Sequence, residues 1–140
     1  MTQLAKGALI TLATLLPSIA PAEGLKLTVE NVRNDVGSIV VLVFDKARAF
    51  NNLAYRRAVD YADIPARPGK VTHRFPELTA GPYAVFLFHD ENGDWDLNYD
   101  TERLLEGVGA TGAPNPEDMP DFDAASVWPG EVTVKMHYYE

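Results

Sequence analysis

The sequence predicts an all-β fold, a single antiparallel β-sandwich of about seven strands with one long acidic loop. Short apolar or alternating runs recur along the chain, and turns rich in Gly, Pro, Asn and Asp separate them. The chain has 140 residues, of which 46% are hydrophobic, so it is long enough for one domain with its own core.

The first half of the chain contributes four of these strands. Residues 25–30 alternate between apolar and polar side chains, which is typical of a half-buried strand. Residues 38–44 are continuously apolar and rich in Val and Ile after the first position, which predicts a central strand covered on both faces. A short strand is expected at residues 55–61, and residues 70–75 alternate again.

The second half has two clear strands and one long connection. Residues 83–88 repeat the continuous apolar pattern, and residues 132–138 alternate. Residues 47–53 lack alternation, which predicts a short helix or a loop. Residues 89–127 show little strand pattern, and a connection of that length in a compact domain is usually functional or disordered.

The N-terminus, residues 1–22, has the pattern of a secretory signal peptide. Lys6 supplies a positive charge, residues 8–16 are apolar, and residues 18–22 offer small side chains for cleavage after Ala22. The apolar run is well short of the roughly 20 residues of a membrane-spanning helix, so an anchor is the less favoured interpretation. We expect residues 23–140 to form a β-sandwich domain that is periplasmic or secreted, with no membrane span after signal cleavage.

The composition excludes several kinds of site and partner. Without Cys the chain has no disulfide, no thiolate metal site and no cysteine nucleophile. A net charge of −8 argues against a nucleic-acid partner, which needs a basic surface. The charge is also local, because residues 90–123 carry eleven acidic side chains and only one basic side chain, Arg103.

The first residues of this acidic tract have the spacing of a cation-binding loop. Asp90, Asn92 and Asp94 occupy the first, third and fifth positions of an EF-hand-like loop. Asp96 then offers its backbone carbonyl at the seventh position, and Asn98 takes the ninth. This arrangement of oxygens suits Ca²⁺, which takes six to eight oxygen ligands.

Two positions depart from the EF-hand pattern. The glycine stands fourth, as Gly93, where an EF-hand has it sixth, and the twelfth residue is Thr101 instead of Glu. No helix pattern precedes the loop either. The bidentate carboxylate must therefore come from elsewhere in the tract, and the candidates are Asp100, Glu102 and Glu106.

A second interpretation of the loop is a solvated turn, since Asn, Asp and Gly are also the residues of turns. Against it stands the repulsion among four Asp side chains within residues 90–100, which destabilises a compact loop without a cation.

Residues 78–85 (LTAGPYAV) lead into residues 89–93 (HDENG), and in this the chain resembles a bacterial exported family catalogued as domain of unknown function 2141. That family typically has a Gly-x-Tyr-Ala-Val strand and a His-Asp-Glu-Asn-Gly loop, followed by Glu-Gly-x-Gly and Phe-x-x-Ala segments. The last two correspond to residues 106–109 and 122–125. The chain departs from the family at Asn98, where Asp is usual, and before Glu106, where a Gly-x-Pro is missing.

The resemblance covers essentially the whole chain after residue 22, and it implies export and fold, not an activity. The strand pattern also resembles Ig-like and transthyretin-like sandwiches. Residue-by-residue matching implies that Glu106 is the carboxylate that joins the Asp90 loop. The predicted calcium ligands are Asp90, Asn92, Asp94, Asp96, Asn98, Asp100 and Glu106.

Other residue types give weaker signals. His89 follows an apolar strand, and a structural role is favoured because no second histidine is close in sequence. Trp95, Tyr99 and Trp128 are expected to cap the end of the sandwich or to stack on a sugar or a partner.

The sequence thus predicts an exported binding or accessory module with a calcium-binding acidic loop, whose partner is a protein or a saccharide. No catalytic residue is assigned. Two alternatives remain open: a carboxylate-based hydrolase acting on saccharides, and a purely structural domain with a solvated acidic loop.

Overall fold

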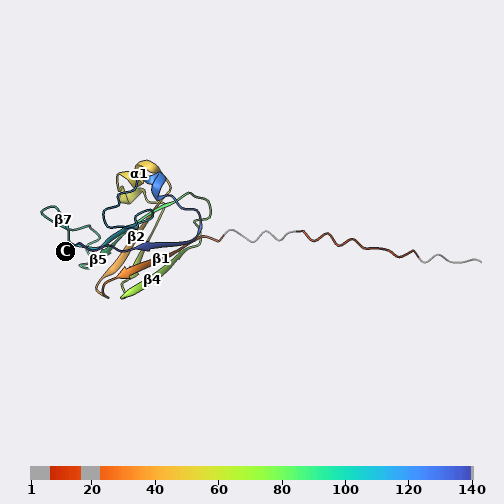
Figure 1. The fold of residues 1–140 in the computed structure, drawn as a ribbon, viewed down its shortest axis with the longest axis horizontal. Coiled ribbons are helices and arrows are strands. Elements are labelled where there is room, and N and C mark those ends of the chain that lie inside the picture. Colours follow the sequence, from red (N-terminus) through yellow and green to blue (C-terminus); the bar gives the residue numbers. More distant parts are fainter. Residues whose placement is uncertain (1–6, 17–22, 140) are drawn as a thin grey trace, which may run out of the picture.

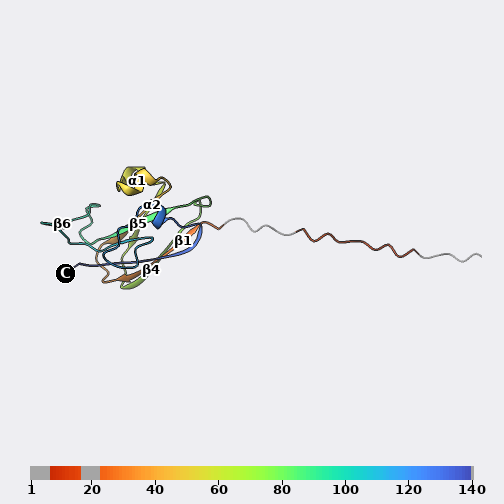
Figure 2. The same cartoon turned by 45° about the horizontal axis from the view of Figure 1, so that its top comes forward.

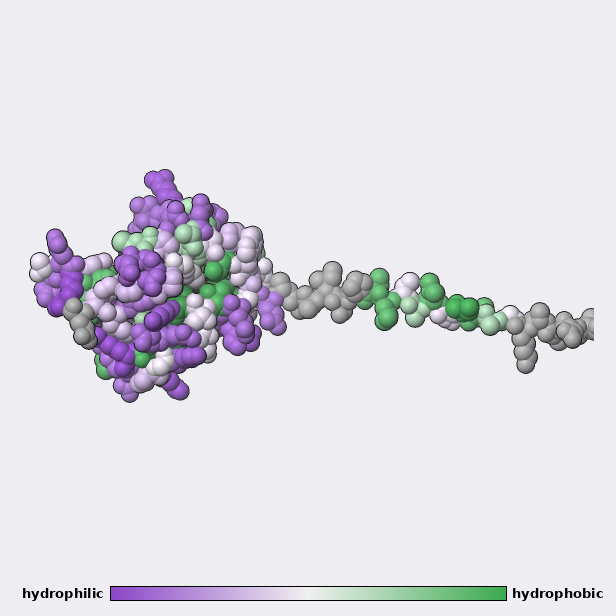
Figure 3. All heavy atoms as spheres, viewed as in Figure 1, coloured by the Kyte–Doolittle hydropathy of each residue, from purple (hydrophilic) through white to green (hydrophobic). Residues whose placement is uncertain are grey.

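The structure, a computed structural model, describes residues 7–16 and 23–139 (Figure 1). Residues 23–139 form the folded body, and residues 7–16 extend away from it without helix or strand. That segment is largely hydrophobic, whereas hydrophilic side chains dominate the face of the folded body seen in Figure 3. Most of the predicted signal peptide lies outside the described residues. Within the described ranges, no helix is long and apolar enough to span a bilayer.

A three-stranded sheet forms one side of the body. Its order is β4 (Gly69–Phe75), β1 (Leu25–Val32) and β9 (Gly130–Lys135). β1 runs antiparallel to β4 and parallel to β9, with Leu25 opposite Phe75 on one side and Gly130 on the other.

The second sheet has four strands, all antiparallel to their neighbours. Its order is β3 (Asp60–Pro65), β2 (Ser38–Phe44), β5 (Ala84–Asp90) and β8 (Val108–Ala110). A separate two-stranded ribbon, β6 (Tyr99–Asp100) and β7 (Arg103–Leu104), projects from the body (Figure 2).

Two apolar cores explain why β2 and β5 are continuously hydrophobic. The first lies between the sheets, where Leu27 and Val29 of β1 pack with Val41 of β2 and Leu87 of β5. The second lies on the outer face of the four-stranded sheet, under α1 (Ala47–Asn51) and α2 (Phe122–Ala125). At its centre Phe50 meets both Phe44 and Phe122 edge-on, with ring centroids 5.8 and 6.2 Å apart. Each of these strands is therefore buried on both faces.

The all-β prediction is confirmed, but the predicted architecture, a single antiparallel sandwich of about seven strands, differs from the observed one. The described chain has nine strands in three sheets, and β9 is parallel to β1. The parallel pairing is possible because residues 33–129 connect β1 to β9, and parallel strands require a long crossover.

Two element boundaries also differ from the sequence prediction. Residues 55–61 were expected as a strand, but Tyr55–Arg57 is a 3₁₀ turn, η1, and β3 begins at Asp60. The turn seats the Tyr55 ring on Phe88 of the outer core, with centroids 6.1 Å apart. At the C-terminus β9 ends at Lys135, and the chain then crosses to bridge His137 with Val108. This crossing brings the last residues beside the acidic loop.

Candidate cation-binding site

The acidic loop starts at Asp90, the last residue of β5, whose side chain is 0% exposed. Pairing with Ser38 of β2 fixes its backbone at the end of the strand. Its Oδ1 accepts a hydrogen bond from the Asp94 N–H (3.2 Å) and its Oδ2 accepts one from the Trp95 N–H (2.9 Å). The loop therefore folds back over the Asp90 carboxylate.

Two residues turn the loop by adopting left-handed backbone conformations. Gly93 has φ 72°, and Trp95, at the sixth position, has φ 58°. An EF-hand places Gly at the sixth position for the same sharp turn. Trp95 is held there by its indole N–H, which donates to Asp63 Oδ2 (2.9 Å), and by an edge-on contact with Tyr61. Contacts with β3 thus support a backbone angle that a bulky residue rarely adopts.

Two side-chain amides converge on Asp94. Asn92 Nδ2 and Asn98 Nδ2 donate to Asp94 Oδ2 at 3.1 and 3.0 Å, and Asn92 Nδ2 also donates to Asn98 Oδ1 (3.0 Å). The hydrogen bond from Asn98, followed by that from the Asp96 backbone, lowers the pKa of the Asp94 carboxyl. A half-turn of either amide presents Oδ1 in place of Nδ2. Each amide can therefore donate to a carboxylate through Nδ2 or coordinate a cation through Oδ1.

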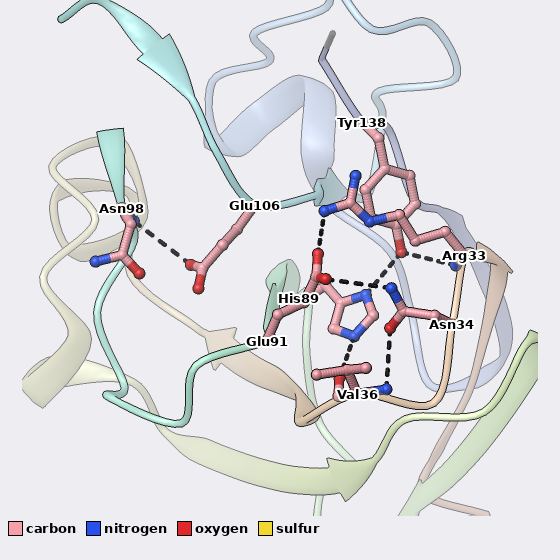
Figure 4. Close-up of polar contacts among 8 residues, drawn as sticks. All are labelled: Arg33, Asn34, Val36, His89, Glu91, Asn98, Glu106 and Tyr138. Atoms are coloured by element: carbon pink, nitrogen blue, oxygen red, sulfur yellow. Dashed lines mark hydrogen bonds and ion pairs between the residues drawn. The ribbon is translucent and has the colours of Figure 1, made fainter. Parts of the chain in front are cut away.

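Glu106 supplies a third carboxyl group. It lies two residues before β8, at the far end of the segment that joins β5 to β8 (Figure 4). Its side chain is 5% exposed, and Oε2 accepts a long hydrogen bond from the Asn98 N–H (3.4 Å). Burial, with smaller contributions from the negative charges of Asp90 and Asp94, raises the pKa of Glu106 to about 7, although the hydrogen bond from the Asn98 N–H opposes the shift.

Asp90, Asp94 and Glu106 each place one carboxylate oxygen within 4.8 Å of the others. Calcium–oxygen distances are about 2.3–2.6 Å, so ligands on opposite sides of one Ca²⁺ lie up to about 5 Å apart. The three oxygens therefore fit around one cation. Of the three, Glu106 also acts on Tyr55, whose pKa is raised to about 12 by burial first and then by the charges of Tyr99, Asp96 and Glu106.

Two predicted ligands keep their carboxylates outside this cluster, although the donor predicted for Asp96 is its backbone carbonyl and not its carboxylate. Asp96 Oδ1 accepts from the Leu97 N–H (3.0 Å), and Asp100 Oδ2 lies 3.9 Å from Arg103 Nη2 on the ribbon. The structure thus joins Asp90, Asn92, Asp94, Asn98 and Glu106 in one bonded group and leaves the carboxylates of Asp96 and Asp100 outside it. Leu97 packs against the outer core.

A second polar network holds the base of the loop (Figure 4). Buried His89 places Nε2 2.7 Å from the Val36 carbonyl and Nδ1 2.9 Å from the Tyr138 hydroxyl. That hydroxyl accepts from the Arg33 N–H (3.0 Å). Since a carbonyl can only accept, Nε2 carries the proton, and in a neutral ring Nδ1 accepts from Tyr138. The favoured structural role of His89 matches this arrangement.

Glu91 ties the same network to the acidic loop. Its carboxylate pairs with the Arg33 guanidinium and accepts from Asn34 Nδ2 (3.2 Å). The Arg33 guanidinium also lies 4.6 Å from the centre of the Tyr138 ring. Arg33 and Tyr138 were not found from the sequence, because only the paired strands bring residues 105 positions apart into contact.

The aromatic side chains near the loop are exposed, so they do not cap the sandwich. Trp95 is 40% and Tyr99 60% exposed, whereas Trp128, 68% exposed, lies away from the loop, against Gly81 before the start of β5. Trp95 and Tyr61 form an exposed edge-on pair beside the loop, with ring centroids 5.8 Å apart. These rings are open to a partner on this side of the molecule.

Comparison with known proteins gives one match. A family model described as "Uncharacterized protein conserved in bacteria (DUF2141)" matches residues 27–136, which confirms the resemblance seen in the sequence. No curated protein matches the chain, and no solved structure does.

Proposed function

The chain belongs to this bacterial family of uncharacterized proteins, DUF2141, and we propose that it is an exported β-sandwich module, of Ig-like or transthyretin-like kind, whose acidic loop binds calcium. The observation that carries the proposal is the meeting of three carboxylates within 4.8 Å, two of them on buried residues. Uncompensated carboxylates in such a place repel one another, and a divalent cation removes the repulsion.

The donor set supports a hard cation. It contains carboxylate and amide oxygens and, in the described cluster, neither thiolate nor imidazole, which is the chemistry that Ca²⁺ prefers over transition metals. Asp90, Asp94 and Glu106 supply charge, and Asn92 and Asn98 supply Oδ1 after a half-turn of their amides. Ca²⁺ takes six to eight oxygens, so backbone carbonyls and water complete the set.

The role of the cation is structural in this proposal. It fixes the loop that carries Trp95 and Tyr99, and these exposed rings then contact a protein or saccharide partner. Export follows from the pattern of residues 1–22, and mass spectrometry of the protein recovered from the periplasm or medium is expected to find Glu23 at its N-terminus. An intact Met1 there would contradict that part of the proposal.

The calcium site is tested by thermal unfolding in excess Ca²⁺ and in EGTA. At about 100 times its dissociation constant a ligand stabilises the folded state by about 2.7 kcal/mol, which for a domain of this size raises Tm by about 10 °C. An Asp90→Asn, Asp94→Asn variant is expected to lose the shift, and Asp100→Asn, outside the cluster, to keep it. Equal Tm values in both buffers would favour the solvated loop instead.

A hydrolase that uses Asp90, Asp94 or Glu106 as its acid or base has no comparable support. The cavity of about 720 Å³ among the described residues is not lined by any of the three clustered carboxylates. A saccharide hydrolase needs its two carboxyl groups on either side of a bound sugar ring.

A further inference from the structure

The molecule has a second candidate site, the cavity of about 720 Å³ between α1, the β6–β7 ribbon and the segment 113–121. Small-molecule sites typically measure about 300–1,000 Å³ and are mainly apolar. Phe50 and Phe86 contribute from the outer core, Leu97 and Leu104 from the acidic loop and the ribbon, and Met119 from the connection to α2.

Several apolar groups of this lining are open to water. Met119 is 95% and Leu53 37% exposed, although both line the cavity. Leu104 is half-buried, and Tyr99 is 60% exposed. A ligand with an apolar body gains free energy by covering these groups, at roughly 25 cal/mol for each Å² removed from water.

The polar part of the lining is strongly acidic. Glu102, Glu117, Asp118 and Asp121 lie along it, and among the described lining residues Arg103 has the one guanidinium or ammonium group. Asp118 and Asp121 already accept hydrogen bonds from backbone N–H groups of their own segment. Glu102 and Glu117 line the cavity and are exposed to solvent, so their negative charges act on molecules that approach it. Such a field attracts cations and repels anions.

Because the lining of this cavity is apolar and its polar part is acidic, we propose that the cavity binds a small amphiphile that has an apolar body and one cationic end, such as an alkylamine. The body lies against Phe50, Phe86 and Leu104, and the ammonium group stays near Glu102 and Glu117. A fatty acid of the same length would place its carboxylate among four like charges. A saccharide has mainly polar groups, so it would not cover the apolar lining with apolar surface.

This site is separate from the proposed calcium site. None of Asp90, Asp94 and Glu106 lines the cavity, although Leu97 and Tyr99 belong to the same loop. The test is therefore made with the full folded protein in EGTA, so that its outcome does not depend on a bound cation.

Three eight-carbon probes distinguish the proposal from non-specific apolar binding: octylamine, octanol and octanoate. Their affinities are measured by chemical-shift titration at pH 7.5. Octylamine is expected to bind at one site, at least about tenfold more tightly than octanoate, with octanol between them. Equal affinity for amine and carboxylate, or no binding of octylamine, would overturn the proposal.

The second part of the experiment reverses the charge of two acidic residues in the cavity lining. The Glu102→Lys, Glu117→Lys variant is expected to bind octanoate more tightly than octylamine. A matched variant, Glu23→Lys, Glu77→Lys, makes the same change of net charge on exposed residues outside the lining and should keep the original order. The same reversal in both variants would show a bulk charge effect and contradict the assignment to this cavity.

The location is tested by two neighbouring leucines. Leu104→Ser removes an apolar wall of the cavity and is expected to weaken all three probes several-fold while keeping their order. Leu105→Ser changes the adjacent residue, which is exposed and outside the lining, and should leave binding unchanged. Loss of binding in neither variant would place the site elsewhere.

Discussion

Replacing Glu106 by Gln removes a buried charge while keeping the shape of the side chain. Glu106 is 5% exposed, and burial, together with the charges of Asp90 and Asp94, raises its pKa from 4.5 to about 7. In the unfolded chain the carboxyl returns to its ordinary pKa. Above pH 7 the folded state therefore carries a charge that costs more free energy than the same charge in the unfolded state.

The sign and size of the effect follow from these two pKa values. Between about pH 4.5 and 7 the unfolded chain loses this proton and the folded chain keeps it, so the wild-type protein loses stability as pH rises. At 1.36 kcal/mol per pKa unit the loss at pH 8 is on the order of 3 kcal/mol. Glu106→Gln does not titrate, so in EGTA it should be more stable than wild type by about that amount at pH 8. At pH 5 the difference should be below about 1 kcal/mol.

Urea unfolding followed by circular dichroism measures this difference at both pH values. Glu117→Gln removes an exposed carboxylate outside the cluster and serves as the control, with an expected change within about 0.5 kcal/mol. In excess Ca²⁺ the order should reverse, because Gln supplies less charge to the cation. A Glu106→Gln protein less stable than wild type at pH 8 in EGTA would refute the argument from buried like charges.

Three further outcomes are expected. Calcium affinity, measured by titration calorimetry, should fall about tenfold from pH 8 to pH 6, since a Glu106 pKa of about 7 leaves about a tenth of the carboxyl charged at the lower pH; an affinity that does not change would contradict it. Tyr138→Phe leaves His89 Nδ1 without its hydroxyl donor and should lower the free energy of unfolding by about 1–3 kcal/mol in urea, whereas a loss below 0.5 kcal/mol would not fit. Gly37→Ala should destabilise more than Gly69→Ala in the same assay, because both have positive φ but only a Cβ at position 37 meets a loop backbone carbonyl; equal losses would show that the carbonyl gives way.

The sequence predicts most of the fold where burial decides the pattern. Residues 39–44 and 83–88 are apolar without interruption, and the structure buries β2 and β5 on both faces. Boundaries and strand direction were harder, because they depend on distant contacts. Tyr55 starts a 3₁₀ turn because its ring stacks on Phe88, and the parallel direction of β9 has no local signal.

The candidate site was predictable to the extent that it is local. Alternate spacing identified the loop side chains from Asp90 to Asn98, and the family resemblance added Glu106. Spacing alone also included Asp100, which the ribbon turns toward Arg103. Arg33 and Tyr138 carry no motif, since their role arises only where β1 and the C-terminal segment meet.

The central claim is tested most directly by titrating the purified protein with CaCl₂ in a calorimeter at pH 8, with MgCl₂ as the comparison. The account predicts one saturating binding event for Ca²⁺, with weaker binding of Mg²⁺, which demands a tighter octahedral site. It predicts loss of the Ca²⁺ event in the Asp90→Asn, Asp94→Asn variant and its retention in Asp100→Asn. Absence of calcium heat in the wild-type protein, together with no effect of calcium on Tm, would contradict it.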